Sequence, residues 1–404
     1  MAALAVGSGR WVAQKKYSCN IDHQTQLSGW YGSRHRSSRY PHLPGRTCKN
    51  FSMKPNPYEG LPACAFWKSG VTQENPYDIQ DVYTRKFVIE PSARIATAGS
   101  CFAQHVSRHL KANGYHVLDV EPPPPGLAPE FHQKYGYSTY SARYGNIYSV
   151  RQLLQLAREV LSGIPLKNCV WEKNDRYYDA FRPSVEPDGL DSPEQVLEHR
   201  QYHLTKVNEL FQNLDLFIFT LGLTEAWHDI ESSTVYPAAP GTLAGEYDPQ
   251  KYKFVNATTF DVVADFHEFQ SVLTDIRKGR AFKVILTVSP VPLTATASGY
   301  HVLPATFYAK STLRSAAGIL YETHDYIDYF PSYEIATNPR LRSASFAENL
   351  RSIRDEAVAN VMGHFFAQHP LIWRNAEDAD LGLDGASAGE DVKCEESLME
   401  AFGA

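Results

Sequence analysis

Two kinds of segment alternate along the middle of the chain. Short, nearly continuous apolar runs have the length and composition of strands buried on both faces of a sheet, at 94–98, 214–221, 282–288 and 326–330. Between and after them, apolar residues recur at helical spacing, at 100–113, 150–161, 193–210, 259–278, 305–324 and 355–366. This alternation predicts a three-layer α/β/α sandwich with a mainly parallel central sheet and long loop insertions.

The remaining segments are less regular. Residues 87–89 and 115–120 are expected to add short strands, and four prolines at 122–125 impose a loop. A surface hairpin insertion is expected at 165–190. Residues 127–148 and 230–256 are polar and aromatic, which is typical of long loops.

Polar residues follow four of the predicted strands directly. They are Gly99-Ser100, Gly222-Leu223-Thr224-Glu225, Ser289-Pro290 and Pro331-Ser332. The carboxyl ends of parallel strands meet at one edge of the sheet, and ligands of such folds bind outside that edge. The sequence therefore predicts a site where these four strand ends converge.

Ser100 and Cys101 lie at the turn between the first strand and its helix. The first amides of a helix favour negative charge, so a nucleophile with an oxyanion site could be built here. Ser100 is the first candidate for that nucleophile, and Cys101 is the alternative. Both residues also have a structural interpretation, in which Ser100 caps the helix and Cys101 packs beneath it.

The sequence Gly-Ser-Cys-Phe-Ala-Gln-His at 99–105 resembles the signature of the GSCFA family, a branch of the SGNH hydrolase-like superfamily. Further segments resemble the family in the same order, at 56–67, 141–156, 220–227, 287–296, 301–314, 329–335 and 346–353. The resemblance covers about residue 55 to about residue 370. It implies an SGNH- or flavodoxin-like fold and a serine at position 100 as the nucleophile.

The resemblance also implies partners for Ser100. Gly145 matches the glycine that donates its amide to the oxyanion. Gly222 opens the third block, in which Thr224 stands where the SGNH pattern has an asparagine and can still donate a hydrogen bond. Glu225 follows it and would orient a base or stay protonated. The fourth block normally reads Asp-x-x-His, but here the chain has Asn349 to Ser352, so the histidine is missing.

A serine without a base is a poor nucleophile, so another histidine has to serve. His301 is the first candidate, because it lies between a strand end and a helix in a segment that resembles the family. His105 and His228 are the other candidates. A base has to reach the hydroxyl to within about 3 Å.

Four further residues are candidates for substrate binding. Arg143 and Asn146 flank Gly145 and could hold a sugar or acyl oxygen, or only make loop hydrogen bonds. Ser289 is either a polar group of the site or a turn residue before Pro290. Lys310 could bind a carboxylate or phosphate, or lie on a solvated helix face.

Composition excludes several function classes. An apolar fraction of 43% over 404 residues suffices for a full core, and a net charge of −6 argues against nucleic acid as the main partner. The sequence has no run of eighteen apolar residues that could span a membrane. Its six cysteines form no CxxC pair or metal-like cluster, so we expect free thiols, a cytoplasmic location and no metal. Phosphate loops of the nucleotide-binding types are absent, so no cofactor is expected, and the oligomeric state is left open.

The two ends differ from the middle. Residues 1–52 contain one acidic residue, Asp22, and no apolar signal core; they could mimic a transit peptide or be a misassigned extension before a true start at Met53. We expect this extension to be poorly ordered, residues 53–372 to form the α/β domain, and residues 373–404 to be an acidic flexible tail.

Two functions are compatible with these features. The first is a serine ester hydrolase or O-acyltransferase that acts on a carbohydrate or other polar acyl ester; a thiol-dependent transferase using Cys101 is a variant of it. The alternative is a catalytically inactive binding protein for a carbohydrate or acylated ligand. The enzyme interpretation requires that the Ser100 hydroxyl is accessible and faces the turn that carries Glu225.

Overall fold

The central sheet consists of four parallel strands in the spatial order β1-β4-β8-β9. The fold is described from a computed structural model, in which residues 56–371 and residue 399 are described. The strands are β1 (Ile95–Gly99), β4 (Leu216–Leu221), β8 (Lys283–Val288) and β9 (Ile327–Tyr329). Every residue of β1, β4 and β9 is buried, as expected for strands covered on both faces. All four strands predicted from the apolar runs are confirmed.

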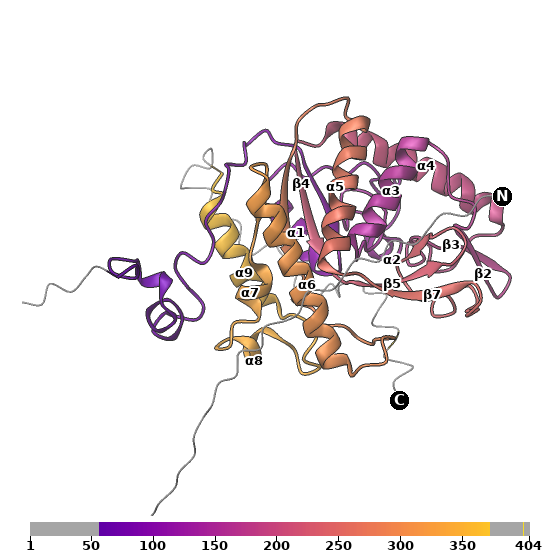
Figure 1. The fold of residues 1–404 in the computed structure, drawn as a ribbon. Coiled ribbons are helices and arrows are strands. Elements are labelled where there is room, and N and C mark those ends of the chain that lie inside the picture. Colours follow the sequence, from indigo (N-terminus) through magenta and orange to yellow (C-terminus); the bar gives the residue numbers. More distant parts are fainter. Residues whose placement is uncertain (1–55, 372–398, 400–404) are drawn as a thin grey trace, which may run out of the picture. The chain divides into compact units, whose positions relative to one another are not determined.

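Helices cover both faces of this sheet (Figure 1). One face packs against α3 (Val150–Ser162), α4 (Pro193–Asn213), α5 (Thr259–Ile276) and α6 (Val302–Thr323). The other packs against α1 (Phe102–Ala112), α7 (Ser332–Ala336) and α9 (Asp355–Gln368). The predicted three-layer α/β/α architecture is confirmed. Shorter helical segments are Ala63–Ala65, Lys68–Thr72, α2 (Pro129–Lys134) and α8 (Arg342–Ser345).

The helix ends follow from local sequence. Ser149 and Gln152 form a reciprocal capping box at the start of α3, and Thr258 and Asp261 do the same for α5. Gly163 ends α3 in the left-handed conformation, with φ at 67°. These caps satisfy amides and carbonyls that the helices themselves leave unpaired.

The strand order places a topological switch point beside β1. Val117 forms a single parallel bridge to Ile95 on the outer side of β1. With that segment counted, the order is that of the flavodoxin-like doubly wound sheet. The helix after β1 covers one face, whereas α5, the helix that links β4 to β8, covers the other. Ligands of open α/β sheets bind at such a point, which here lies between the ends of β1 and β4.

Two smaller sheets belong to the insertions. The hairpin predicted at 165–190 is confirmed as β2 (Val170–Lys173) and β3 (Arg176–Asp179). A three-stranded antiparallel sheet in the order β6-β5-β7 was not predicted; its strands are β5 (Glu225–Asp229), β6 (Val235–Tyr236) and β7 (Tyr252–Asn256). Its strands are short and carry polar residues, so their pattern is indistinguishable from that of a loop.

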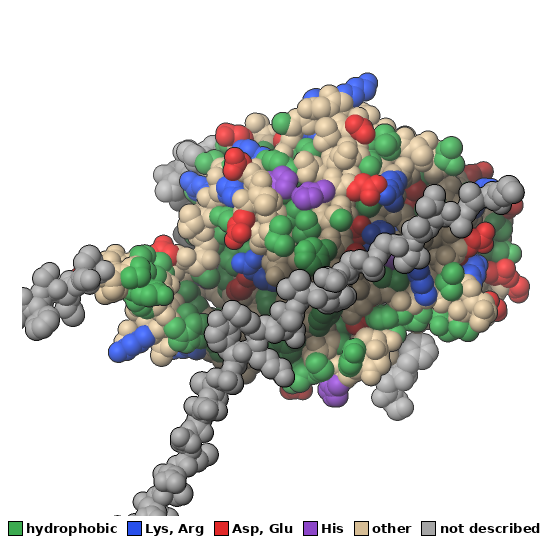
Figure 2. Space-filling model, viewed as in Figure 1, with side chains coloured by type: hydrophobic (Ala, Val, Ile, Leu, Met, Phe, Trp, Pro, Cys, Tyr) green, Lys and Arg blue, Asp and Glu red, His purple; other side chains and the backbone are tan. Residues whose placement is uncertain are grey.

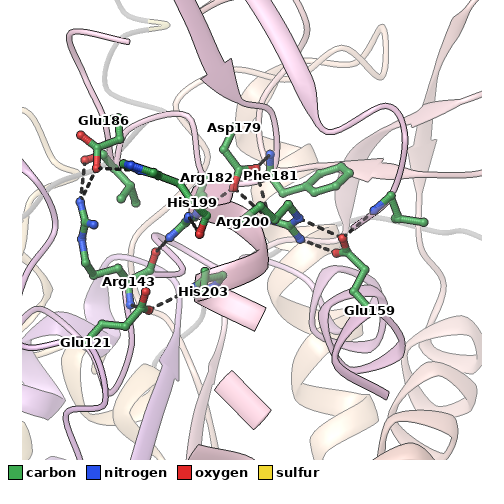
Figure 3. Close-up of polar contacts among 12 residues, drawn as sticks. Glu121, Arg143, Glu159, Asp179, Phe181, Arg182, Glu186, His199, Arg200 and His203 are labelled. Atoms are coloured by element: carbon green, nitrogen blue, oxygen red, sulfur yellow. Dashed lines mark hydrogen bonds and ion pairs between the residues drawn. The ribbon is translucent and has the colours of Figure 1, made fainter. Parts of the chain in front are cut away.

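Buried ion pairs fix the hairpin insertion to the helices (Figure 3). Arg200 of α4 pairs with Glu159 of α3 and with Asp179 at the end of β3. Arg182 donates to the same Asp179 carboxylate over 2.7 Å. Burial opposes ionisation of Asp179, but Arg200 and Arg182 outweigh it and lower its pKa to about 2. These charges are paired and hydrogen-bonded, which is what makes their burial tolerable.

Two expected strands are wrong, and three short helices were not predicted. Residues 87–89 form no strand; directly before them, the Lys86 amide donates to Asp328 over 2.9 Å. Residues 115–120 contribute only the bridge at Val117. The segment predicted as a loop at 127–148 contains α2, and α7 and α8 follow β9 without a clear apolar period.

The ends of the chain are described only in part. The expectations for residues 1–52 and 373–404 lie outside the described residues. Residues 56–59, assigned to the first of two compact units, form a turn closed by the Glu59 amide and the Asn56 carbonyl.

Within the described ranges, no helix is both long and apolar enough to cross a membrane. Basic and acidic side chains are interspersed on the face shown in Figure 2.

Candidate functional site

Ser100 lies directly after β1, at the switch point of the sheet. Its amide donates to the Thr220 carbonyl of β4 over 3.1 Å, which ties the end of β1 to the end of β4. The residue is only 2% exposed, and its Oγ has no hydrogen-bond partner. The expectation of an accessible hydroxyl is therefore wrong, because the oxygen is enclosed.

Glycines permit this close approach of the strand ends. A Cβ on Gly222 would lie 2.7 Å from the Ser100 Cβ and 3.1 Å from the Tyr148 carbonyl oxygen. A Cβ on Gly99, whose φ is +141°, would lie 2.5 Å from the Thr220 carbonyl oxygen. Side chains at either position would push β1 and β4 apart. Gly222, the first residue of the third block, is thus in direct contact with Ser100.

Three buried hydroxyls without a hydrogen-bond partner belong to residues at or directly after the ends of β1 and β4. Besides Ser100 Oγ, these are the Oγ1 atoms of Thr220 and Thr224. Both threonines flank Gly222 in the chain, and Thr224 is 2% exposed. Leaving a buried hydroxyl unbonded costs about 1–3 kcal/mol relative to a bonded one.

An amide and tyrosine network lies on the other side of Ser100. The Tyr140 hydroxyl lies 3.1 Å from the Ser100 carbonyl oxygen and also reaches Asn146 Oδ1. Gln104 of α1 donates to the same Asn146 oxygen over 3.1 Å, and the Asn146 amide donates to the Tyr148 hydroxyl over 3.2 Å. Asn146 is therefore linked to the Ser100 backbone through Tyr140, and its expected role in holding a sugar or acyl oxygen stays a prediction. The sequence analysis missed Gln104, Tyr140 and Tyr148, although all three lie in or beside segments that resemble the family.

Gly145 lies in the same loop, with a left-handed φ of 67°. Two residues later, the Ile147 amide donates to the Gly99 carbonyl over 2.8 Å and so holds the loop against β1. Within the described residues, no hydrogen bond links Gly145 to Ser100. Its role as an amide donor stays a prediction.

Lys310 of α6 is buried, not solvated. Its Nζ donates to the Gly222 carbonyl over 2.9 Å, and the side chain is only 2% exposed. Ser289, at the end of β8, is also buried, and its amide donates to the Leu221 carbonyl over 2.8 Å. Lys310, from α6, and Ser289, from the end of β8, therefore both bond to the end of β4. The interpretation of Lys310 as a residue on a solvated helix face is wrong.

Glu225 lies at the start of β5 and is half-buried. Its Oε1 accepts a hydrogen bond from the Thr296 hydroxyl over 2.7 Å. Burial raises the pKa of this carboxyl group, although the hydrogen bonds from Thr296 and from the Ala297 backbone oppose the shift. Within the described structure no histidine is hydrogen-bonded to Glu225, so its expected role of orienting a base stays a prediction.

The candidate bases are not hydrogen-bonded to Ser100. His301 is exposed and caps α6, with Nδ1 accepting from the Leu303 amide over 3.1 Å. His105 and His228 are buried, and burial lowers their pKa values to about 3 and about 4. None of the hydrogen bonds among the described residues joins a histidine to the Ser100 hydroxyl.

The fourth block forms an exposed turn. Asn349 Oδ1 accepts from the Arg351 and Ser352 amides, and its Nδ2 donates to the Ser352 hydroxyl over 3.0 Å. Asn349 and Ser352, which the sequence analysis matched to the acid and base positions of the SGNH pattern, therefore bond to each other as neutral groups. They offer no proton acceptor comparable to imidazole.

Two further candidates have structural partners. The Arg143 guanidinium donates to the Tyr135 carbonyl and pairs with Glu186 over 2.8 Å, on the side of the ion-pair network (Figure 3). Cys101 is buried at the first turn of α1, as the packing interpretation expects. In the described part of the chain, no group of three or more His, Cys, Asp or Glu residues could hold a metal ion.

An open pocket adjoins the Gly222 turn. It has an empty volume of about 750 Å³, including adjoining solvent. Leu223 and Glu225 of the turn line it, together with Trp227, Phe254 and Leu293. Leu223 directly follows Gly222, so the lining of the pocket begins one residue after the glycine that packs against Ser100.

The match to a known protein family covers the central sheet and the residues around Ser100. The model of the GSCFA family matches residues 94–365, which include β1, Ser100, the Gly222 turn and all strands of the central sheet. No curated protein and no solved structure matches the chain.

Proposed function

Because the chain belongs to the GSCFA family and keeps its strand-end serine without a base beside it, we propose that the protein binds an acylated ligand at the carboxyl edge of the central sheet without hydrolysing it. In this proposal the fold is that of an SGNH-like protein whose acid and base positions have been lost. The carbohydrate or other polar alcohol part of the ligand would lie outside the strand ends.

One observation carries this proposal: Ser100 Oγ is enclosed and has no hydrogen-bond partner. Catalysis by a serine needs a base within hydrogen-bonding reach and access for the acyl carbon. His301 caps a helix instead, and the Asn349 turn has no imidazole. The switch-point location and the adjoining pocket support ligand binding independently of any base.

A direct test uses 4-nitrophenyl acetate and an acetylated sugar. We expect the acetylated sugar to raise the melting temperature of the full chain, with a shift that grows logarithmically once its concentration exceeds the dissociation constant. We also expect no release of nitrophenol beyond the rate of a Ser100→Ala variant. Ester cleavage that disappears in Ser100→Ala would overturn the proposal, and so would the absence of any ligand effect on melting.

The second candidate is a serine ester hydrolase or O-acyltransferase with Ser100 as nucleophile. The three unpaired hydroxyls of Ser100, Thr220 and Thr224 favour it, because an oxyanion site also needs unspent donors. In that case the Thr224 hydroxyl and backbone amides would stabilise the oxyanion, at roughly 3 kcal/mol per donor. It further requires an opening of the enclosure and a base supplied by another element.

A further inference from the structure

The pocket beside the Gly222 turn has two walls, which come from different parts of the chain. One wall is the antiparallel sheet, with Ala226 and Trp227 of β5 and Phe254 of β7. The opposite wall is the loop between β8 and α6, with Leu293 and 295–297. The cleft therefore opens at the same edge of the central sheet as Ser100.

The walls of the pocket are mainly apolar. Trp227 and Phe254 lie opposite each other in the β5–β7 ladder, with ring centroids 5.9 Å apart, and Pro237 and Ala238 complete the aliphatic part. Glu225 is the only charged residue in the lining of this pocket as the structure describes it. Sites with this composition bind an apolar group and use their few polar groups to orient it.

The pocket and the Ser100 enclosure share a wall. Leu223 packs in a cluster with Tyr148, Leu293 and Ala305, and it also lines the pocket. Its amide, like that of Gly222, donates to the Tyr148 carbonyl over 3.0 Å. Leu223 thus belongs both to the lining of the pocket and to the packing around Tyr148, which contacts Gly222.

We propose that this pocket binds the acyl group of the ligand, as an apolar chain or ring, with an uncharged head beside Glu225. This inference rests on the proposed function and names the part of the ligand that the pocket recognises. A free carboxylate in the same place would lie near the Glu225 carboxyl group and would be repelled when that group is ionised. Neutral acyl esters and alcohols should therefore bind better than the matching fatty acids.

The test compares three probes by calorimetry on the full chain: methyl octanoate, octanoate and an acetylated sugar. Ala295→Phe fills the pocket from an exposed position of its rim, and Ala112→Phe, at the exposed end of α1, is the matched control. We expect methyl octanoate to bind at least tenfold more tightly than octanoate at pH 8. We expect Ala295→Phe, but not Ala112→Phe, to weaken methyl octanoate at least tenfold.

The outcomes separate this inference from the proposed function. If the acetylated sugar binds but methyl octanoate does not, or if Ala295→Phe leaves its affinity unchanged, the acyl pocket is overturned while ligand binding stands. Equal affinity for octanoate and its methyl ester would overturn the role of Glu225. If none of the probes binds, both the pocket and the proposed function fall.

Discussion

Gly222 and Ser100 are packed so closely that a single added carbon at position 222 would lie 2.7 Å from the Ser100 Cβ. The backbone of Ser100 is itself held by Thr220, so neither side can retreat without breaking the β1–β4 ladder. The signature turn after β1 and the third block are therefore one packing unit.

We expect Gly222→Ala to destabilise the fold by about 1–3 kcal/mol, as overpacking of a buried site does. The measurement is the free energy of unfolding in urea. Gly363→Ala in α9 is the matched control, because no atom lies within 4 Å of its added Cβ; it should stabilise by up to about 1 kcal/mol through helix propensity. An unchanged stability of Gly222→Ala would contradict the close packing.

Ser100→Ala should stabilise the protein, whereas most truncations of buried side chains destabilise it. The variant removes a buried hydroxyl that has no hydrogen-bond partner, so we expect a gain in stability of about 1 kcal/mol. Ser149→Ala, which removes the bonded hydroxyl cap of α3, is the control and should lose about 1 kcal/mol. If both variants lose stability to a similar extent, the Ser100 hydroxyl has a partner in solution.

Lys310→Met should destabilise the strand-end turn. Methionine keeps most of the buried side chain but cannot donate to the Gly222 carbonyl, so the loss should be about 1–3 kcal/mol. The same change at the exposed Lys167 should be within about 0.5 kcal/mol of zero. Equal effects of the two substitutions, measured in urea, would show that the Lys310 bond does not stabilise the turn.

The sequence predicted the central fold because its signals are strong. The strand from Leu216 to Leu221 is continuously apolar, and Ser149 and Gln152 mark the start of α3 by their capping pattern. The antiparallel sheet was not foreseen, because β6 has two residues and β5 carries Glu225 and His228. Its strands are specified by pairing with each other and not by local pattern.

The site was predictable in its location but not in its contacts. Parallel strand ends converge by topology, so Ser100, Gly222 and Ser289 could be brought together from sequence. Burial of Lys310 and capping by His301 depend on how α6 packs, and a lone lysine or histidine in a sequence contains no signal for that. The turn of Arg143 toward Glu186 likewise depends on the hairpin insertion, whose position is not encoded locally.

Stability should fall as the pH drops below 6.5, and His203 contributes to this. Burial lowers its pKa to about 4, although Glu121, 2.7 Å away, opposes the shift. The unfolded chain takes up a proton at this residue near pH 6.5, whereas the folded chain does so only near pH 4. The stabilising effect is therefore present above pH 6.5 and is lost between pH 6.5 and 4, on the order of 1–3 kcal/mol.

His203→Gln tests this dependence, because glutamine can still donate to Glu121 but does not titrate. We expect the unfolding free energy of the variant to decline less steeply between pH 6.5 and 4 than that of the parent. Ser149→Ala removes a similar amount of stability without removing a titrating group, so its curve should run parallel to that of the parent. A parallel curve for His203→Gln would refute the assignment.

Labelling with a fluorophosphonate probe tests the central claim most directly, because the probe reacts only with a serine that is both activated and accessible. The full chain would be incubated with the probe at pH 7.5 and the modified residue located by peptide mass spectrometry, with Ser100→Ala as the blank. The account predicts no modification at position 100, since the hydroxyl is enclosed and no base is hydrogen-bonded to it. Stoichiometric modification of Ser100 that is absent from Ser100→Ala would contradict it and establish an enzyme.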